Sequence, residues 1–238
     1  NIKSIKIGDN LKNNNKVVST FKCLSRYENF YKINNTIASG SHYIIENNRI
    51  IRVSNYQHAV PITYNSEFTY CLTTEQKKIN INNNIFLDFD DLSLDFINLF
   101  KGNNIKINKI VDAGIDKNSK IKMEDGTNKC IKDIKLGDKL YDNTTVLGIV
   151  NLNNNNVINN YCVLPNGSIL SENNILLENN NEVYLKETYE SLSILNDLEV
   201  NNTLYHLVTS SRYFYIGDIK IVHYSDLIDI YIKKYFNQ

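Results

Sequence analysis

Short apolar runs alternate with polar breaks along the whole chain, and this pattern predicts an all-β fold. The runs are bounded by Gly, Asn or Asp, and such turn signals recur about every 8–12 residues, as in sandwich or barrel-like proteins. The predicted strands span residues 5–7, 43–45, 50–53, 70–72, 85–87, 144–150, 182–185, 212–216 and 218–222. Helical spacing of apolar residues is confined to 92–99 and 225–235.

An internal repeat organises the chain. Residues 2–11 and 131–140 are identical at 7 of 10 positions without a gap. Three later matches follow in the same order, namely 39–48 with 171–180, 69–74 with 204–209, and 89–92 with 224–227. Because the offset drifts only from 129 to 135, we expect a tandem duplication. Copy one would be residues 1–100 and copy two residues 114–238, with a junction at 101–113, and a short helix would close each copy.

Charge and composition exclude several classes of function. Lys and Arg together number 26, as do Asp and Glu, so the chain lacks the excess of basic residues that nucleic-acid binding needs. No run approaches the 18 consecutive apolar residues of a membrane span, so we expect none. The beginning of the chain has neither Met nor an apolar signal core. We therefore expect a fragment or a processed product without a secretion signal.

Asparagine is unusually frequent. The chain has 40 Asn, and its 22 Lys stand against 4 Arg, which suggests an AT-rich genome such as that of a protist, a large DNA virus or a low-GC bacterium. Asn tolerates the left-handed backbone conformation of turns. The runs at 13–15, 82–84, 153–156 and 179–181 therefore predict turns or loops.

Cysteine and histidine do not form a metal motif. The cysteines are far apart, and four of them allow three pairings that sequence cannot decide; they are Cys23, Cys71, Cys130 and Cys162. Since each lies among apolar or β-forming residues, we expect buried free thiols in a reducing compartment. The four His lack zinc-finger spacing, so we expect no metal and no cofactor. Asp88, Asp90, Asp91 and Asp95 lack the Gly of a calcium loop, and we expect a solvated acidic face.

Three segments resemble the Hint (Hedgehog/intein) domain family. Residues 121–140 resemble the opening of that domain, in which an apolar strand leads into Asp-Gly, a second strand and Gly-Asp. Ser39-Gly-Ser-His42 resembles the Thr-x-x-His motif of the family, and residues 68–75 resemble its late strand. The resemblance covers most of both copies. It implies two tandem, horseshoe-like, all-β Hint domains with pseudo-twofold symmetry.

The same resemblance implies self-processing chemistry, from which copy two departs. In the family a Cys or Ser attacks the preceding carbonyl, and the motif His polarises or protonates the scissile amide nitrogen. In copy two the nucleophile position falls at Gly114, with Ser119 nearby, and the motif His is replaced by Asn174. The chain ends in Asn237-Gln238 rather than in His-Asn, so copy two is predicted to be inactive.

Copy one keeps part of the pattern. The candidate catalytic residues are Ser39, His42 and Cys71, all in copy one. The resemblance places the opening strand and nucleophile of this copy outside the sequence, and Asp88-Phe-Asp-Asp91 stands where His-Asn would be. Some family members that lack the first nucleophile use a Cys at the position of Cys71. The alternatives are a structural histidine in a β-turn at position 42 and a protonated, buried thiol at position 71.

Two functions follow. The first is a structural or protein-interaction scaffold with a protein partner in a larger protein or assembly, a virion if the source is viral, and without enzymatic activity. The second is autoprocessing, in which copy one cleaves an upstream peptide bond by an acyl shift. A reducing intracellular compartment or a virion is the expected location.

Overall fold

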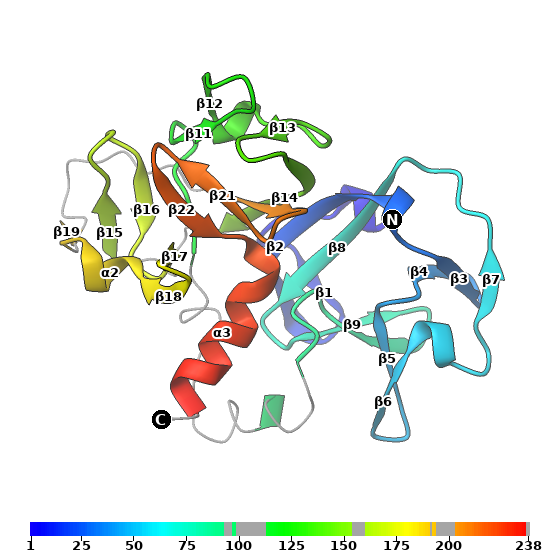
Figure 1. Ribbon diagram of the computed structural model, residues 1–238. Coiled ribbons are helices and arrows are strands. Elements are labelled where there is room, and N and C mark those ends of the chain that lie inside the picture. Colours follow the sequence, from blue (N-terminus) through cyan, green and yellow to red (C-terminus); the bar gives the residue numbers. More distant parts are fainter. Residues whose placement is uncertain (93–96, 99–112, 154–159, 191, 194–202, 237–238) are drawn as a thin grey trace. The chain divides into compact units, whose positions relative to one another are not determined.

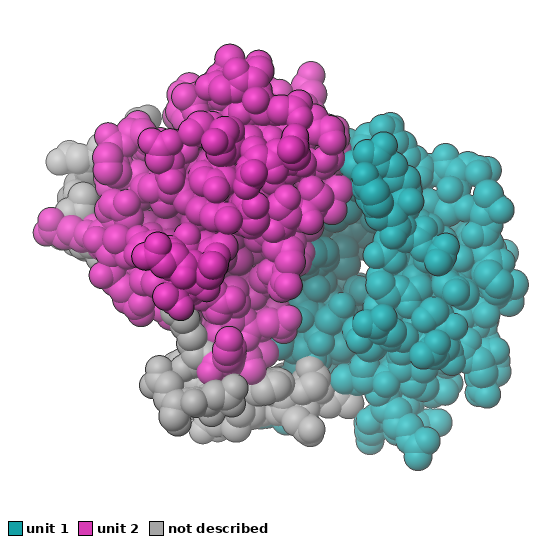
Figure 2. Space-filling model, viewed as in Figure 1, with its two compact units in different colours: residues 1–106 teal, residues 107–238 magenta. Residues whose placement is uncertain are grey.

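Most of the regular secondary structure in the described residues is β-strand, so the predicted all-β class is confirmed (Figure 1). The structure is a computed structural model, which describes residues 1–92, 97–98, 113–153, 160–190, 192–193 and 203–236. The chain divides into unit 1, residues 1–106, and unit 2, residues 107–238 (Figure 2). Nearly all of the junction expected at 101–113 lies outside the described residues. In the described parts of the chain, no helix has the length and apolar character needed to cross a membrane.

The described residues of unit 1 form ten strands and short 3-10 helices. The strands are β1 (Asn10–Leu11), β2 (Asn15–Leu24), β3 (Phe30–Ile33), β4 (Thr36–Ser39), β5 (Tyr43–Glu46), β6 (Arg49–Arg52), β7 (Val60–Ile62), β8 (Phe68–Thr74), β9 (Lys78–Ile81) and β10 (Asn84–Leu87). The 3-10 helices are η1 (Ile2–Ser4), η2 (Lys12–Asn14), η3 (Ser25–Tyr27) and η4 (Val53–Asn55). Strand β2 pairs with β1 and β8, strand β3 with β4 and β7, and β6-β5-β10-β9 form a four-stranded sheet.

Unit 2 repeats this set and adds two strands before it. The added strands are β11 (Lys120–Lys122) and β12 (Asn128–Cys130). The other strands are β13 (Lys139–Leu140), β14 (Thr144–Asn153), β15 (Asn160–Val163), β16 (Ile169–Ser171), β17 (Ile175–Glu178), β18 (Asn181–Tyr184), β19 (Leu192–Ser193), β20 (Thr203–Thr209), β21 (Tyr213–Ile216) and β22 (Ile219–Val222). The helices are η6 (Ile131–Asp133), α2 (Leu185–Thr188) and α3 (Tyr224–Phe236).

The two units use the same ladders. In unit 2, β14 pairs with β13 and β20, β15 pairs with β16 and β19, and β18-β17-β22-β21 answers the four-stranded sheet of unit 1. Even the irregularity is shared, because the β2–β8 register shifts between Val17 and Ser19 and the β14–β20 register between Val146 and Gly148. The strand pattern that the sequence predicted is thus repeated with the same partners in each unit.

Pairs of asparagines close several hairpins, and those within the runs 82–84 and 179–181 lie where the sequence predicted turns. Asn47 and Asn48, with φ of 49° and 60°, connect β5 to β6. Asn179 and Asn180, with φ of 49° and 64°, connect β17 to β18. Two consecutive residues with positive φ match the type I′ turn, whose twist suits a two-residue hairpin. Asn accepts this conformation because its short polar side chain bonds locally.

The core of unit 2 is more complete than that of unit 1. Ile131, Ile134 and Leu140 are buried in one cluster with the apolar residues of β11, β16 and β21. Their counterparts in unit 1, Ile2 and Ile5 among them, are half-buried. The described part of unit 1 has no equivalent of β11 and β12, and the apolar face that those strands cover in unit 2 is therefore less enclosed.

Two predictions of local structure need comment. Residues 5–7 were expected to be a strand but are an extended connection and a turn, because Gly8, at φ 88°, reverses the chain before β1. The helix expected at 225–235 is confirmed by α3, whereas most of 92–99 lies outside the described residues.

Candidate functional site

In unit 2 the position expected for a nucleophile, Gly114, lies at the edges of β16 and β20. The Gly114 carbonyl accepts a 2.8 Å hydrogen bond from the N–H of Ser171. Ile115 exchanges two backbone hydrogen bonds with Tyr205, of 3.0 and 2.9 Å. The N–H of Asp116 donates to the Ile169 carbonyl at 2.9 Å. Residues 114–116 therefore form a short strand that bridges both edges.

Asn174 holds this short strand with its side chain. Its Nδ2 donates to the Gly114 carbonyl at 3.2 Å and to the Ser171 carbonyl at 3.0 Å. The side chain is fully buried, and its Oδ1 has no hydrogen-bond partner among the described residues. An amide can bind a carbonyl oxygen, but it has no proton to exchange near neutral pH. The structure thus brings together the two positions that the sequence comparison singled out in copy two.

Ser119, the hydroxyl nearest to Gly114 in sequence, is bonded to backbone. Its Oγ donates to the Ile169 carbonyl and accepts from the Ile169 N–H, both at 3.1 Å. The residue is almost entirely buried. Both hydrogen bonds fasten the chain before β11 to β16, which is a structural role.

In unit 1, His42 follows strand β4 and is mostly buried. Its Nδ1 lies 3.7 Å from Asp91 Oδ1, and its ring stacks on Phe86 with centroids 6.1 Å apart. Burial lowers the pKa of His42 from 6.5 to about 4, and a hydrogen bond with the Leu87 backbone opposes this shift only in part. The imidazole is therefore neutral at pH 7.

The side chains of Ser39 and Cys71 form no hydrogen bond with the His42 ring in the described residues, whereas the His42 backbone N–H donates to the Ser39 carbonyl at 3.2 Å. The Ser39 hydroxyl lies 3.2 Å from that of Ser41, which donates to Glu28 at 2.8 Å. Cys71 lies on β8 with its Sγ 3.8 Å from the Leu72 carbonyl. Burial raises the pKa of the Cys71 thiol well above its usual range, so the thiol is protonated and weakly nucleophilic. The three candidate residues do not form a hydrogen-bonded catalytic chain.

In the acidic cluster after β10, Asp88 and the side chain of Asp90 are buried, so the prediction of a solvated face was wrong for these two residues, whereas Asp91 is exposed. The Asp88 side chain accepts hydrogen bonds from the N–H groups of Thr74 at 2.7 Å and Asp90 at 3.2 Å. Burial raises the pKa of Asp88 to about 7 and that of Asp91 to about 8. Asp95 lies outside the described residues.

Lys77 is the residue that sequence reasoning missed. Its Nζ lies 2.6 Å from Asp90 and 3.9 Å from Asp88. Burial alone would lower the pKa of Lys77, but these carboxylates outweigh burial and raise it. A lysine in a polar turn gives no sign of burial in the sequence.

Unit 2 has an ionic cluster at the matching place. His223 Nδ1 accepts from the Thr209 N–H at 3.0 Å, so we assign its proton to Nε2, which lies 3.0 Å from Asp226. Burial would raise the pKa of Asp226, but hydrogen bonds from His223 and Arg212 outweigh it and lower the value. Asp88 and His223 thus perform the same task, since Asp88 accepts the last N–H of β8 and His223 accepts the last N–H of β20.

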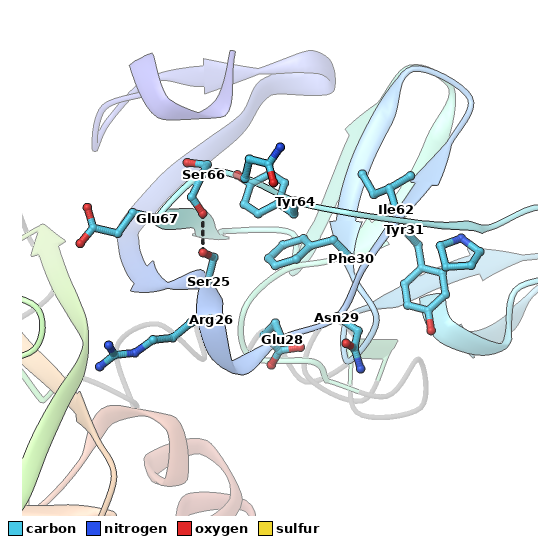
Figure 3. Close-up of a pocket in the computed structure, with 12 residues that line it drawn as sticks. Ser25, Arg26, Glu28, Asn29, Phe30, Tyr31, Ile62, Tyr64, Ser66 and Glu67 are labelled. Carbon is cyan, nitrogen blue, oxygen red and sulfur yellow. Dashed lines mark hydrogen bonds between the residues drawn. The ribbon is translucent and has the colours of Figure 1, made fainter.

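A pocket of about 670 Å³ lies in unit 1 where β3, β7 and the segment before β8 meet (Figure 3). Phe30 and Tyr64 stack in its wall with centroids 4.1 Å apart. Arg26, Glu28 and Glu67 supply charge around the opening. Ser25 closes one side through a hydrogen bond to the Ser66 carbonyl. Glu28 also receives the Ser41 bond, so this wall is connected to the loop that carries Ser39 and His42.

The cysteines are free, as expected, but three of the four are only half-buried. Cys162 alone is fully buried, whereas Cys23, Cys71 and Cys130 are partly exposed. Across the described residues, no group of three or more His, Cys, Asp or Glu side chains could hold a metal ion.

Comparisons with known proteins found a likeness among solved structures. No protein-family model matches the chain, and no curated protein matches it. Among solved structures, the chain is similar to the crystal structure of the gp41-1 intein, with 18% sequence identity and a TM-score of 0.34. The alignment covers 47% of this chain and 98% of the intein chain. The all-β class rests on the strands and ladders described above.

Proposed function

We propose that this chain is a tandem Hint-like module that has lost most of its self-processing residues and serves as a protein-interaction scaffold in a larger assembly. The two copies would descend from one ancestor by duplication, which the shared ladders of the units support. A protein partner is part of the proposal, and no catalytic turnover is required.

The observation that carries the proposal is the contact between Asn174 and Gly114. The amide nitrogen binds the carbonyl of a residue that has no side chain with which to attack. Acyl-shift chemistry needs a nucleophile and a group that moves a proton, and this pair supplies neither. What remains is a set of hydrogen bonds that stabilises the short strand formed by residues 114–116.

Unit 1 supports the same conclusion by a different route. Burial keeps the His42 imidazole neutral and the Cys71 thiol protonated. Among the described residues, no hydrogen bond connects these two side chains. An unactivated thiol reacts slowly because only the thiolate is a good nucleophile.

Intact mass measurement tests the proposal. Two fusions would place a reporter protein directly before Asn1 and directly before Ala113. We expect both to remain uncut after purification, with or without dithiothreitol or hydroxylamine. A cleavage product at either junction would overturn the scaffold function.

Autoprocessing by unit 1 is the second candidate, favoured by one observation. His42 occupies the position of Asn174, whose side chain touches the carbonyl of the seated strand in unit 2. If a strand bound unit 1 at the place that residues 114–116 occupy in unit 2, the imidazole would face a backbone carbonyl of that strand. If the fusion at Asn1 were cut, a His42→Ala variant that is still cut would exclude His42 as the proton donor.

A further inference from the structure

The strand formed by residues 114–116 lies in the interior of unit 2 and binds the edges of two other strands. Its four backbone hydrogen bonds use the Ser171 N–H, the Ile169 carbonyl and both backbone groups of Tyr205. Ile115 is 0% exposed and belongs to the main core of the unit. One extended segment therefore joins the edge of β16 to the edge of β20 and fills the space between them.

Unit 1 has the same two edges in the same register. Ser39 is opposite Phe30 as Ser171 is opposite Tyr161. Tyr70 is opposite Lys22 as Tyr205 is opposite Asn151. Groups that face away from a neighbouring strand alternate along a ladder, so the matched register directs these backbone groups outward as in unit 2.

Within the described residues, no strand lies on these two edges of unit 1. Strand β4 pairs only with β3, and β8 only with β2. The Ser39 N–H, the Ile37 carbonyl and both backbone groups of Tyr70 therefore have no partner there. Unpaired edge groups of this kind are a template for a further strand.

Exposure agrees with an incomplete edge. Ala38 and Ser39 are half-buried. The matching Leu170 and Ser171 of unit 2 are fully buried beside the short strand. The difference in exposure corresponds to the surface that a strand bound to unit 1 at this edge would cover.

We propose that unit 1 binds an extended peptide of a partner polypeptide by strand addition between β4 and β8. The bound segment carries a small residue followed by an aliphatic one, as Gly114 and Ile115 do in unit 2. Main-chain hydrogen bonds supply the affinity in this mode, and the side-chain pocket supplies the selectivity. The inference rests on the proposed interaction function, for which it names the class of partner.

A second copy of this chain is a poor occupant. Its own segment of the right character, residues 113–116, is already buried inside unit 2. To donate that segment, a copy would have to give up the four hydrogen bonds and the buried Ile115. A separate polypeptide bears no such cost.

Amide hydrogen exchange of the full chain tests the proposal. Without peptide, we expect the amides of Ser39 and Tyr70 to exchange fast and those of Ser171 and Tyr205 to exchange slowly. A synthetic peptide with the sequence of residues 113–122 should slow Ser39 and Tyr70 by at least about tenfold at saturation. The unit 2 amides provide the internal control, because their partners are already in place.

A second peptide, methylated on the backbone nitrogen of the residue that copies Ile115, is the matched control. It keeps every side chain but loses the N–H that would bond to the Tyr70 carbonyl, so we expect no protection. Slow exchange of Tyr70 without peptide, or equal protection by both peptides, would overturn the inference. Lack of protection would leave the scaffold function standing, whereas a cut fusion protein would overturn the scaffold function itself.

Discussion

The ammonium group of Lys77 and the carboxylate of Asp90 lie 2.6 Å apart, and their side chains are only 5% and 4% exposed. Asp88, which is fully buried, lies 3.9 Å from the same ammonium group. A buried ion pair contributes little net stability, but removing one partner leaves charge without compensation. This cluster therefore determines how unit 1 responds to mutation and to pH.

We expect Lys77→Met to lower the free energy of unfolding by about 3–5 kcal/mol at pH 7, because two buried carboxylates lose their counter-charge. The loss should shrink at pH 5, because burial raises the pKa of Asp88 to about 7 and this carboxyl is protonated there. Urea unfolding at both pH values measures it. Lys122→Met is the control, since its partner Asp218 is 96% exposed, and little change is expected there. Equal effects of the two variants would contradict the assignment.

The raised carboxyl pKa values predict that stability falls as pH rises from 6.5 to 8. Burial raises the pKa of Asp88 from 3.8 to about 7 and that of Asp91 to about 8, so the folded state keeps protons that the unfolded chain has lost. The free energy of unfolding then decreases with pH through this window. Burial lowers the pKa of His42 to about 4 and that of His206 to about 3, and these residues act in the opposite direction, but only below 6.5.

Asp88→Asn tests this pH dependence, because the amide oxygen can still accept from Thr74 but cannot titrate. We expect a flatter profile of unfolding free energy between pH 6.5 and 8, measured by urea titration. Asp218→Asn, at an exposed carboxylate, should leave the slope unchanged. A wild-type profile that rises through this window would show that the carboxylates are ionised in the folded state.

Asn174→Ala should destabilise unit 2 by about 1–3 kcal/mol, because the Gly114 and Ser171 carbonyls lose a buried donor. Chemical unfolding followed by near-ultraviolet circular dichroism gives the value. The neighbouring Asn173→Ala removes only an exposed bond to Lys186 and is expected to be nearly neutral. If Asn174→Ala were also neutral, the amide would not be holding the strand.

The turn at Asn47 and Asn48 gives a prediction about the backbone. Asn48→Ala should cost about 1–2 kcal/mol, because alanine is strained at the positive φ of 60°. Asn48→Gly should restore the stability, since glycine adopts this conformation freely. Thermal unfolding compares the two variants, with Asn80→Ala in strand β9 of the same sheet as the control. A stable Asn48→Ala protein would indicate that the hairpin does not depend on this turn.

The β-strands and their turns could be predicted from the sequence because period-two alternation and Asn pairs are local signals. The family resemblance pointed to Gly114 and the repeat to Asn174, and in the structure Asn174 Nδ2 lies 3.2 Å from the Gly114 carbonyl oxygen. The burial of Lys77 and Asp88 could not be predicted, since it depends on how β8, β9 and β10 fold back on one another. The strand predicted at residues 5–7 was wrong for a similar reason, because Gly8 turns the chain where the alternation of apolar and polar residues favours a strand.

The shared ladders have a consequence for refolding. Residues 2–11 and 131–140 are 70% identical by the count of 7 in 10, and each precedes a ten-residue strand with a bulge at the same place. During synthesis, each copy of this segment emerges separately and meets its own partners first. In a chain released from denaturant, both copies compete for both sets of partners at once, which is a known route to misassembly in repeat proteins. The yield of natively folded protein after denaturation should therefore be lower for the whole chain than its modest size would suggest.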